Sequence, residues 1–281
     1  MRVTLWGTRG SLPAVGPETM RYGGNTSCVE VRGSDGTLLV LDAGSGIRRL
    51  GTTLGPEVSR FHLLLTHLHM DHILGLGFFQ PLYDAEAEVH IWGPPSTTLG
   101  LQERLTRYLS PPLFPVRLRD LPCQLTLHDV PFTSFGVGDL EVMANLVCHP
   151  GPTLGYRVVE GNTSVAYLPD HEPALGADGI PTDARWLSGH ELAVGVNLLI
   201  HDAQYSEPEY ADHVGWGHSS VLQALKFAGA VQVERLVTFH HDPWHDDAAL
   251  DELLAEARRD FDATFEVVPG TEGASFQLSE K

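Results

Sequence analysis

The stretch Thr66-His67-Leu68-His69-Met70-Asp71-His72-Ile73-Leu74-Gly75 holds three histidines and one aspartate within six residues. It follows the largely apolar run 61–65, which predicts a buried strand that ends near Thr66. Imidazole and carboxylate groups are common ligands of zinc and manganese. We therefore interpret the stretch as a metal-binding loop. The alternative, a solvated loop rich in histidine, is disfavoured by the apolar residues on both sides.

The spacing within this loop favours two metals over one. His67 and His69 are two positions apart, so in an extended backbone their side chains project on the same side. Asp71 and His72 follow where the chain turns toward a helix. One tetrahedral metal cannot easily take four ligands from so short a loop. We expect His67 and His69 on one metal, and Asp71 and His72 on the other.

The overall charge limits the partners that this chain can bind. Its 281 residues carry a formal net charge of −18. This charge disfavours a long nucleic acid, because affinity for nucleic acids comes largely from Lys and Arg that neutralise phosphates. It does not exclude a small phosphorylated substrate held by metal ions, since bound cations reverse the local field.

Composition and patterning indicate a cytoplasmic globular protein. No apolar run approaches the ~20 residues of a membrane span, and residues 1–7 lack the apolar segment of a signal peptide. We therefore expect no membrane partner. The three cysteines are far apart and define no zinc site. The oligomeric state is left open, with a homodimer as one alternative.

The pattern of elements predicts one domain over residues 1–281 with two β-rich halves. Strands are expected at 3–6, 28–32, 38–42, 61–66, 125–130, 140–147, 155–160, 164–168, 197–201, 236–239, 265–268 and 274–278. Helices are expected at 97–109 after Ser96 as N-cap, at 219–228 with Gly229 as its end, and at 246–261. Sheets packed face to face with helices outside are the simplest arrangement. Segments 93–135 and 173–189 are candidate walls of a cleft.

The His-rich loop resembles the H-x-H-x-D-H signature of the metallo-β-lactamase fold hydrolases, and the likeness extends over nearly the whole chain. Asp42-Ala43-Gly44-Ser45-Gly46 resembles the turn that follows a strand in that family. The resemblance implies an α/β (α+β) fold, the four-layer αββα sandwich, which agrees with the strand and helix pattern.

The resemblance also implies the remaining metal ligands and two divalent ions, Zn²⁺ or Mn²⁺. The first metal would take His67, His69, His149 and Asp170. The second metal would take Asp71, His72, Asp170 and His240, with His241 as the rival of His240. Diiron members of the family carry Glu where this chain has His69, so the histidine favours zinc or manganese.

Further motifs resemble ribonuclease Z and its phosphodiesterase relatives. Gly215-Trp216-Gly217-His218-Ser219-Ser220 resembles their G-H-S-[ST] motif, whose histidine contacts the scissile phosphate. His201-Asp202-Ala203-Gln204 resembles their H-E-A-T motif with Asp for Glu, and Asp202 is expected to orient His218. The bridging ligand is Asp170, whereas the true β-lactamases commonly place a cysteine on the second metal.

Three residues are candidate substrate contacts: Asn25, Trp216 and Ser219. Trp216 either stacks on a base or packs within the protein. Asn25 either contacts the substrate or forms a turn.

The predicted function is a binuclear metal-dependent phosphodiesterase that acts on a small cyclic nucleotide or cyclic phosphate. A metal-bridging hydroxide would attack phosphorus, Asp71 would also handle the proton of the water, and His218 would protonate the leaving alkoxide. A tRNA 3′-processing endonuclease is disfavoured, because only 21 positions separate His149 from Asp170. That spacing leaves room for a hairpin but not for a tRNA-clasping insertion. A lactonase or thioesterase on the same metals is the main alternative, followed by a non-catalytic sensor and a diiron redox protein.

Overall fold

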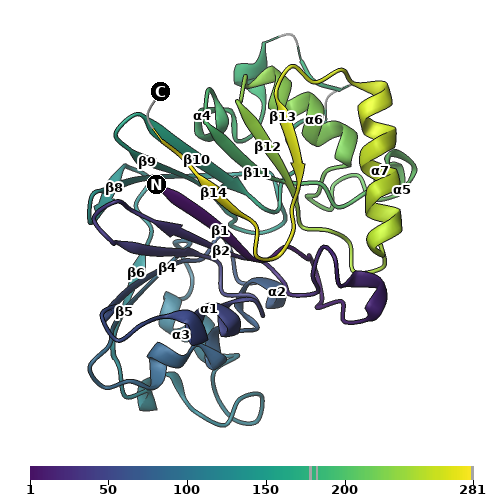
Figure 1. Cartoon of the computed structure of the whole chain (residues 1–281). Helices are drawn as coiled ribbons and strands as arrows, with labels where there is room; N and C mark the ends of the chain where they lie inside the picture. Colours follow the sequence, from purple (N-terminus) through teal and green to yellow (C-terminus); the bar gives the residue numbers. More distant parts are fainter. Residues whose placement is uncertain (177–178, 182, 280–281) are drawn as a thin grey trace.

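The computed structural model describes residues 1–176, 179–181 and 183–279, and their strands form two seven-stranded sheets (Figure 1). The first sheet has the order β14-β1-β2-β3-β4-β5-β6. Its strands are β1 (Arg2–Gly7), β2 (Cys28–Arg32), β3 (Leu38–Leu41), β4 (Arg60–Leu64), β5 (Glu88–Gly93), β6 (Gln124–Asp129) and β14 (Ser275–Gln277).

The second sheet has the order β13-β12-β11-β10-β9-β8-β7. Its strands are β7 (Phe135–Val137), β8 (Leu140–Leu146), β9 (Leu154–Glu160), β10 (Thr163–Leu168), β11 (Leu198–Asp202), β12 (Arg235–Phe239) and β13 (Glu266–Pro269). In each sheet, four neighbouring strands are parallel: β3 to β6 and β10 to β13. Loops that leave parallel strands at their carboxyl ends meet at one edge, where ligands bind in such sheets.

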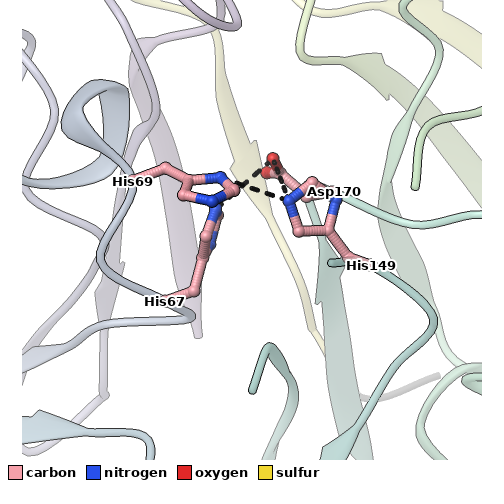
Figure 2. A group of neighbouring side chains, drawn as sticks. All are labelled: His67, His69, His149 and Asp170. Atoms are coloured by element: carbon pink, nitrogen blue, oxygen red, sulfur yellow. Dashed lines mark hydrogen bonds and ion pairs between the residues drawn. The ribbon is translucent and has the colours of Figure 1, made fainter. Parts of the chain in front are cut away.

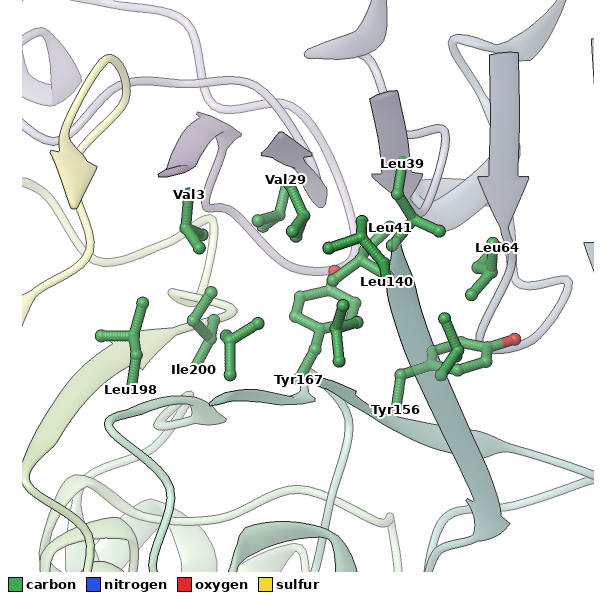
Figure 3. Packing of buried hydrophobic residues seen from close by; sticks show 14 of the residues in the cluster. Val3, Val29, Leu39, Leu41, Leu64, Leu140, Tyr156, Tyr167, Leu198 and Ile200 are labelled. Carbon is green, nitrogen blue, oxygen red and sulfur yellow. The ribbon is translucent and has the colours of Figure 1, made fainter. Parts of the chain in front are cut away.

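The two sheets pack face to face over one apolar layer (Figure 3). Val29 and Leu41 of the first sheet face Tyr167 and Ile200 of the second, and all four side chains are fully buried. In β1 the buried and less buried positions alternate, as expected of a strand with one face in a core. This layer holds the two ligand-bearing edges at a fixed separation.

Helices cover the outer face of each sheet (Figure 1). The α-helices are α1 (Ile47–Thr53), α2 (Met70–Ile73), α3 (Leu101–Thr106), α4 (His190–Ala193), α5 (Glu207–Asp212), α6 (Val221–Ala230) and α7 (Asp247–Asp260). The 3₁₀-helices are η1 (Pro17–Thr19), η2 (Leu76–Phe78), η3 (Gln80–Tyr83), η4 (Leu118–Asp120) and η5 (Ala184–Trp186). The predicted αββα sandwich is therefore confirmed. In the described part of the chain, no helix has the length and apolar character to span a membrane.

The helix predicted over 97–109 is shorter in the structure and has a different N-cap. Helix α3 begins at Leu101, and its N-cap is Gly100, whose backbone N–H donates to Glu103. The Ser96 hydroxyl instead accepts from the backbone N–H of Thr98 at 3.3 Å, which forms a local turn. Ser side chains favour such turns as readily as helix caps, so the prediction of Ser96 as N-cap was wrong.

Gly229 does not end α6, which continues to Ala230. A Cβ at Gly229 would lie 2.9 Å from the ring of Phe261. The glycine therefore allows the residue that follows α7 to pack closely against α6. Gly229 serves helix packing, and the prediction that it terminates the helix was wrong.

Candidate metal centre

The loops at one end of the two sheets bring the seven predicted ligands together in two groups. In each group, one nitrogen or carboxylate oxygen per residue lies within 4.8 Å of all the others. The first group is His67, His69, His149 and Asp170, and the second is Asp71, His72, Asp170 and His240. The ligands leave β4, β8, β10 and β12 at their carboxyl ends. The sequence prediction and the observed grouping therefore agree residue by residue.

In the first group three imidazoles surround one carboxylate oxygen (Figure 2). Asp170 Oδ2 lies 3.7 Å from Nε2 of His67 and 3.8 Å from Nε2 of His149. His69 presents its other ring nitrogen, Nδ1, 3.3 Å from Nε2 of His149. His67, His149 and Asp170 are buried, whereas His69 is exposed. The open side of this group is therefore at His69.

The second group shares Asp170 with the first. His72 Nε2 lies 2.9 Å from Asp170 Oδ1 and 3.2 Å from Asp71 Oδ2. His240 Nε2 lies 3.1 Å from Asp71 Oδ2 and 3.4 Å from Asp170 Oδ2. Because Asp170 contacts imidazoles of both groups, its carboxylate is in the position of a bridge.

The inward-facing atoms of this centre have the properties of metal ligands. Nε2 of His67 is buried without a hydrogen-bond partner among the described residues, and Nε2 of His72 and Oδ1 of Asp170 are buried with only each other, at 2.9 Å, and Asp71 nearby. A buried polar atom without a partner costs on the order of 1–3 kcal/mol, so several that converge on one point call for a ligand. The donor set fits divalent metal ions.

Hydrogen bonds to the outer ring nitrogens hold four of the histidines in the orientation that a metal requires. Nδ1 of His149 lies 3.0 Å from Gly217 O, and Nδ1 of His240 lies 2.9 Å from Gln204 Oε1. Because these oxygens accept, each Nδ1 carries a proton, and each Nε2 is the nitrogen that can offer its lone pair to a metal. His67 and His72 are bonded in the same way, through Thr66 and Asp42.

The structure brings His240 into the centre and keeps His241 out of it. His241 is buried on the other side of the chain, where its Nε2 lies 2.9 Å from the carbonyl of Gly270. Burial lowers the pKa of His241 to about 4, so it stays neutral in this contact. The side chain of His241 is thus already bonded away from the centre, and only His240 of the pair reaches it.

Backbone strain is concentrated at the metal centre. Four non-glycine residues of the described chain have a positive φ, and three of them are Ser11, Asp42 and His240, at 60°, 59° and 59°. The backbone N–H of Ser11 donates to Asp71 Oδ2 at 2.8 Å, and Asp42 bonds the ligand His72. Such conformations cost about 1–3 kcal/mol each and cluster at functional sites. Here the strain aims donors and ligands at the centre.

Asp42 is a support of the centre that the sequence reasoning missed. Its buried carboxylate accepts from Nδ1 of His72 at 2.7 Å, from Thr66 Oγ1 at 2.9 Å and from the Tyr167 hydroxyl at 3.0 Å. The sequence had indicated only a turn at this position. An acidic residue directly at the end of a buried strand was the available signal.

Replacing Asp42 by asparagine is expected to weaken metal binding about 10–100-fold, the usual cost of losing the partner of a ligating histidine. The asparagine side chain keeps the shape of the aspartate but loses the negative charge that faces Nδ1 of His72. Competition titration of the metal-free protein with a chelating dye would measure this change. Asp129→Asn, at the exposed end of β6, is the matched control. An Asp42→Asn affinity equal to that of the control would contradict the supporting role.

Metal affinity is expected to rise with pH up to about pH 9. Burial opposes the charge on His240, but Asp170 and the bonded Asp71 together raise its pKa to about 9 in the metal-free protein. Below that pH the imidazole is protonated, and a metal must displace the proton to bind. Each displaced proton raises the apparent affinity about tenfold per pH unit. Mn²⁺ titrations between pH 6.5 and 8.5 would measure the slope, and a flat profile would contradict the ligand role of His240.

His218 and Asp202 form a hydrogen-bonded pair beside the second ligand group. Nδ1 of His218 lies 2.6 Å from Asp202 Oδ2, and the backbone N–H of Ser219 donates to Asp202 Oδ1 at 3.0 Å. The His218 ring stacks on that of His240 with centroids 4.9 Å apart. Asp202, His218 and His240 also form a third compact group of possible ligands. The short bond to Asp202 leaves Nε2 of His218 free.

Of the three predicted substrate contacts, only Trp216 reaches a cavity. Its side chain is exposed and lines a cavity together with His218. Asn25 is a turn residue: its backbone and side-chain N–H groups donate to Glu272, and its side-chain oxygen accepts from Ser45. Ser219 is fully buried, and its hydroxyl donates to His171 O at 2.6 Å. The polar side chains of Asn25 and Ser219 are therefore already bonded within the protein, and their contact with substrate stays a prediction.

Glu172 holds the loop that carries Trp216 and His218, and the sequence reasoning assigned it no role. Its buried carboxylate accepts from the backbone N–H groups of Gly215 and Gly217, at 3.0 and 2.9 Å, and from the Tyr210 hydroxyl at 2.8 Å. Gly217 O in turn holds the ring of His149. One carboxylate thus couples this loop to the first ligand group.

The predicted wall at 93–135 reaches the centre. Pro94 and Arg104 line a cavity together with His67 and His69. The second predicted wall, 173–189, includes residues 177, 178 and 182, which lie outside the described residues.

The fold and this donor set define a metal-dependent hydrolase of the metallo-β-lactamase type. The family model described as a beta-lactamase superfamily domain matches residues 37–241. The chain belongs to this superfamily, in its branch similar to ribonuclease Z.

Two relatives and three solved structures illustrate that likeness. Ribonuclease Z of Haloarcula marismortui is 27% identical, with 97% of this chain and 95% of the relative covered. Ribonuclease Z of Myxococcus xanthus is 25% identical, with 95% of each covered. Human short-form tRNase Z is 22% identical with a TM-score of 0.69, and each chain is covered completely.

YhfI of Bacillus subtilis is 19% identical with a TM-score of 0.70, and 98% of this chain and 99% of YhfI are covered. A diphosphatase of the PhnP family is 18% identical with a TM-score of 0.70, and 99% of this chain and 98% of the diphosphatase are covered. At these identities the solved structures show the fold alone.

Proposed function

We propose that this protein is a binuclear metal-dependent phosphodiesterase that hydrolyses a small diester such as a cyclic nucleotide or cyclic phosphate. The observation that carries the proposal is the pair His218–Asp202, bonded at 2.6 Å and stacked on the ligand His240. This pair adds a proton donor beside a centre that already has two ligand groups.

The residues of the chain divide the work of diester hydrolysis between them. When bound, two divalent ions supply an activated water and offset charge on the phosphate. Asp202 accepts from Nδ1 of His218, which leaves Nε2 to face the phosphate. When His218 is protonated, Nε2–H can donate to a phosphate oxygen or to the leaving alkoxide. Asp71, whose carboxylate accepts from the backbone N–H of Ser11, would also accept a proton from the water.

The ligand set supports zinc or manganese. Five imidazoles and two carboxylates form the two groups, and this combination suits Zn²⁺ or Mn²⁺. His69 contributes a nitrogen to the first group, where an iron site would favour further oxygen ligands.

The chain between His149 and Asp170 supports a small substrate over tRNA. Strands β9 and β10 form one antiparallel hairpin over this interval, so no long insertion is present there to hold a tRNA. The net charge of −18 also opposes a polyanion. The names of the ribonuclease Z relatives favour the RNA alternative, which is therefore the second candidate.

A substrate panel tests the proposal against both alternatives. The protein loaded with Mn²⁺ or Zn²⁺ would be assayed on bis(p-nitrophenyl) phosphate, a 2′,3′-cyclic nucleotide, a lactone, a thioester and a precursor tRNA. We expect turnover of the two small diesters. Faster turnover of the lactone or thioester, or cleavage of the tRNA at its 3′ end with little turnover of the small diesters, would contradict the proposal.

A further inference from the structure

A cavity of about 370 Å³ opens beside His218, on the side of the second ligand group. Its walls include Leu12, Tyr205, His213, Trp216, His218 and Trp244, and we call it the aromatic pocket. The volume lies at the lower end of the range for small-molecule sites, roughly 300–1,000 Å³. The pocket is therefore large enough for a single ring system next to the reacting phosphate.

We propose that the aromatic pocket binds a nucleobase, stacked against Trp216 and Trp244, while the phosphodiester of the same substrate lies at the metal ligands. This inference rests on the proposed phosphodiesterase function and narrows its substrate class to small nucleotides with one diester.

Two exposed tryptophans at one cavity are the first observation behind this assignment. Trp244 is 89% exposed and Trp216 is 60% exposed. Both project large apolar rings into solvent at the same opening, a position that contributes little to the stability of the fold. Tryptophan rings are effective stacking surfaces for bases, which all have a flat π face.

Both tryptophans lie on loops that buried side chains hold in place. The fully buried Arg9 donates from Nη1 to the carbonyls of Asp242 and His245, at 3.0 and 2.6 Å, on either side of Trp244. Trp216 lies between Gly215 and Gly217, whose N–H groups donate to Glu172. Ordered loops lose little entropy when a ligand binds, so the rings of Trp216 and Trp244 are preorganised for binding.

A chain of ring contacts leads from the pocket entrance to the proposed proton donor. Trp216 contacts His213 edge to face at 4.7 Å, and His213 stacks on Tyr205 at 4.8 Å. Tyr205 meets His218 at 6.0 Å. A base in the pocket would therefore place its attached sugar phosphate toward His218 and the metal ligands.

The charge of the lining favours a neutral ring over a second phosphate. The carboxylates of Glu209 and Asp242 line the pocket. Among the described residues, the side-chain carboxylate of Asp242 accepts only from the Trp244 backbone N–H and the Gln204 amide, and that of Glu209 contacts Nε2 of His245. Burial is the main cause of the raised pKa of Tyr205, and the nearby carboxylates of Asp202, Asp242 and Glu209 raise this pKa further. A second phosphate would meet repulsion there, whereas the amino groups of a base would not.

The test compares Trp216→Ala and Trp244→Ala with the matched control Trp186→Ala. Trp186 is 84% exposed and lies in η5, outside the residues that line the pocket. For each metal-loaded protein, kcat/KM is measured on 2′,3′-cyclic AMP and on the same cyclic ribose phosphate without a base. We expect the ratio of the two values to fall about tenfold in each pocket variant, in keeping with the strength of base stacking, and to stay unchanged in the control. Equal ratios in all three variants would overturn the proposal.

A binding measurement separates failure of this inference from failure of the proposed function. Adenosine, which has no phosphate, is titrated into each protein while tryptophan fluorescence is followed. We expect quenching in the parent protein and in Trp186→Ala, with about tenfold weaker binding in Trp244→Ala. If neither cyclic phosphate is hydrolysed, the proposed function fails. The titration alone then decides whether the aromatic pocket binds a nucleobase. Absence of saturable adenosine binding to the parent protein would overturn the nucleobase assignment.

Discussion

Replacing Asp170 by alanine is expected to remove bound metal and hydrolytic activity together. Asp170 is the one residue that both ligand groups share, and its carboxylate contacts imidazoles of each. Without it, the histidines lose the negative charge that offsets two divalent cations. Metal-ion catalysis contributes several kcal/mol to the stabilisation of the transition state, so activity should fall about 10³-fold or more.

Elemental analysis of the purified Asp170→Ala protein would measure the loss directly. We expect the metal content to fall well below that of the parent protein, with the circular dichroism spectrum retained. Asp262→Ala, an exposed aspartate that follows α7, is the matched control and should keep both metal and activity. An Asp170→Ala protein that retains the full metal content would refute the bridging assignment.

The His218→Ala protein is expected to keep its metals and to lose diesterase rate about 10²-fold or more, the typical contribution of a positioned acid or base. His218 is outside the two four-residue groups and bonds Asp202 through Nδ1. Its removal should lower kcat much more than it raises KM, because the proton is needed chiefly in the transition state.

Asp202→Asn separates proton donation from simple packing in this pair. The amide keeps the size of the side chain but weakens its hold on the imidazolium, so its rate should lie between those of the parent and His218→Ala. His190→Ala in α4 is the control for loss of a histidine elsewhere. If the His218→Ala rate equals that of this control, His218 has no catalytic role.

The His-rich motif and the family resemblance that it carries named the candidate ligands, and the structure brings these residues together because each follows a strand. The pattern around His67, together with His149, Asp170 and His240, named the seven residues that the structure brings into two groups. Strand ends are readable from apolar runs, and parallel strands place their carboxyl ends at one edge. The alternation of apolar runs and turns likewise predicted the sandwich. The helix boundaries at Ser96 and Gly229 were wrong because local turn bonds and interhelical packing decided them.

The supporting residues could not be predicted because they depend on pairings across the fold. Asp42 reaches His72 across β3 and β4, and Gln204 reaches His240 across β11 and β12. Trp244 can be recognised as a candidate binding residue only from the structure, in which Arg9 holds the loop that carries it. Asn25 and Ser219 were chosen from neighbouring motif positions, where sequence does not reveal whether a polar group is already bonded inside the protein.

The most direct test of the central claim is a titration of metal-free protein with Mn²⁺ while the hydrolysis of bis(p-nitrophenyl) phosphate is followed. The account predicts no hydrolysis without metal and a rate that rises until two ions per chain are bound, and then stays constant. Full activity with one ion per chain, or no diester hydrolysis with both groups filled, would contradict it.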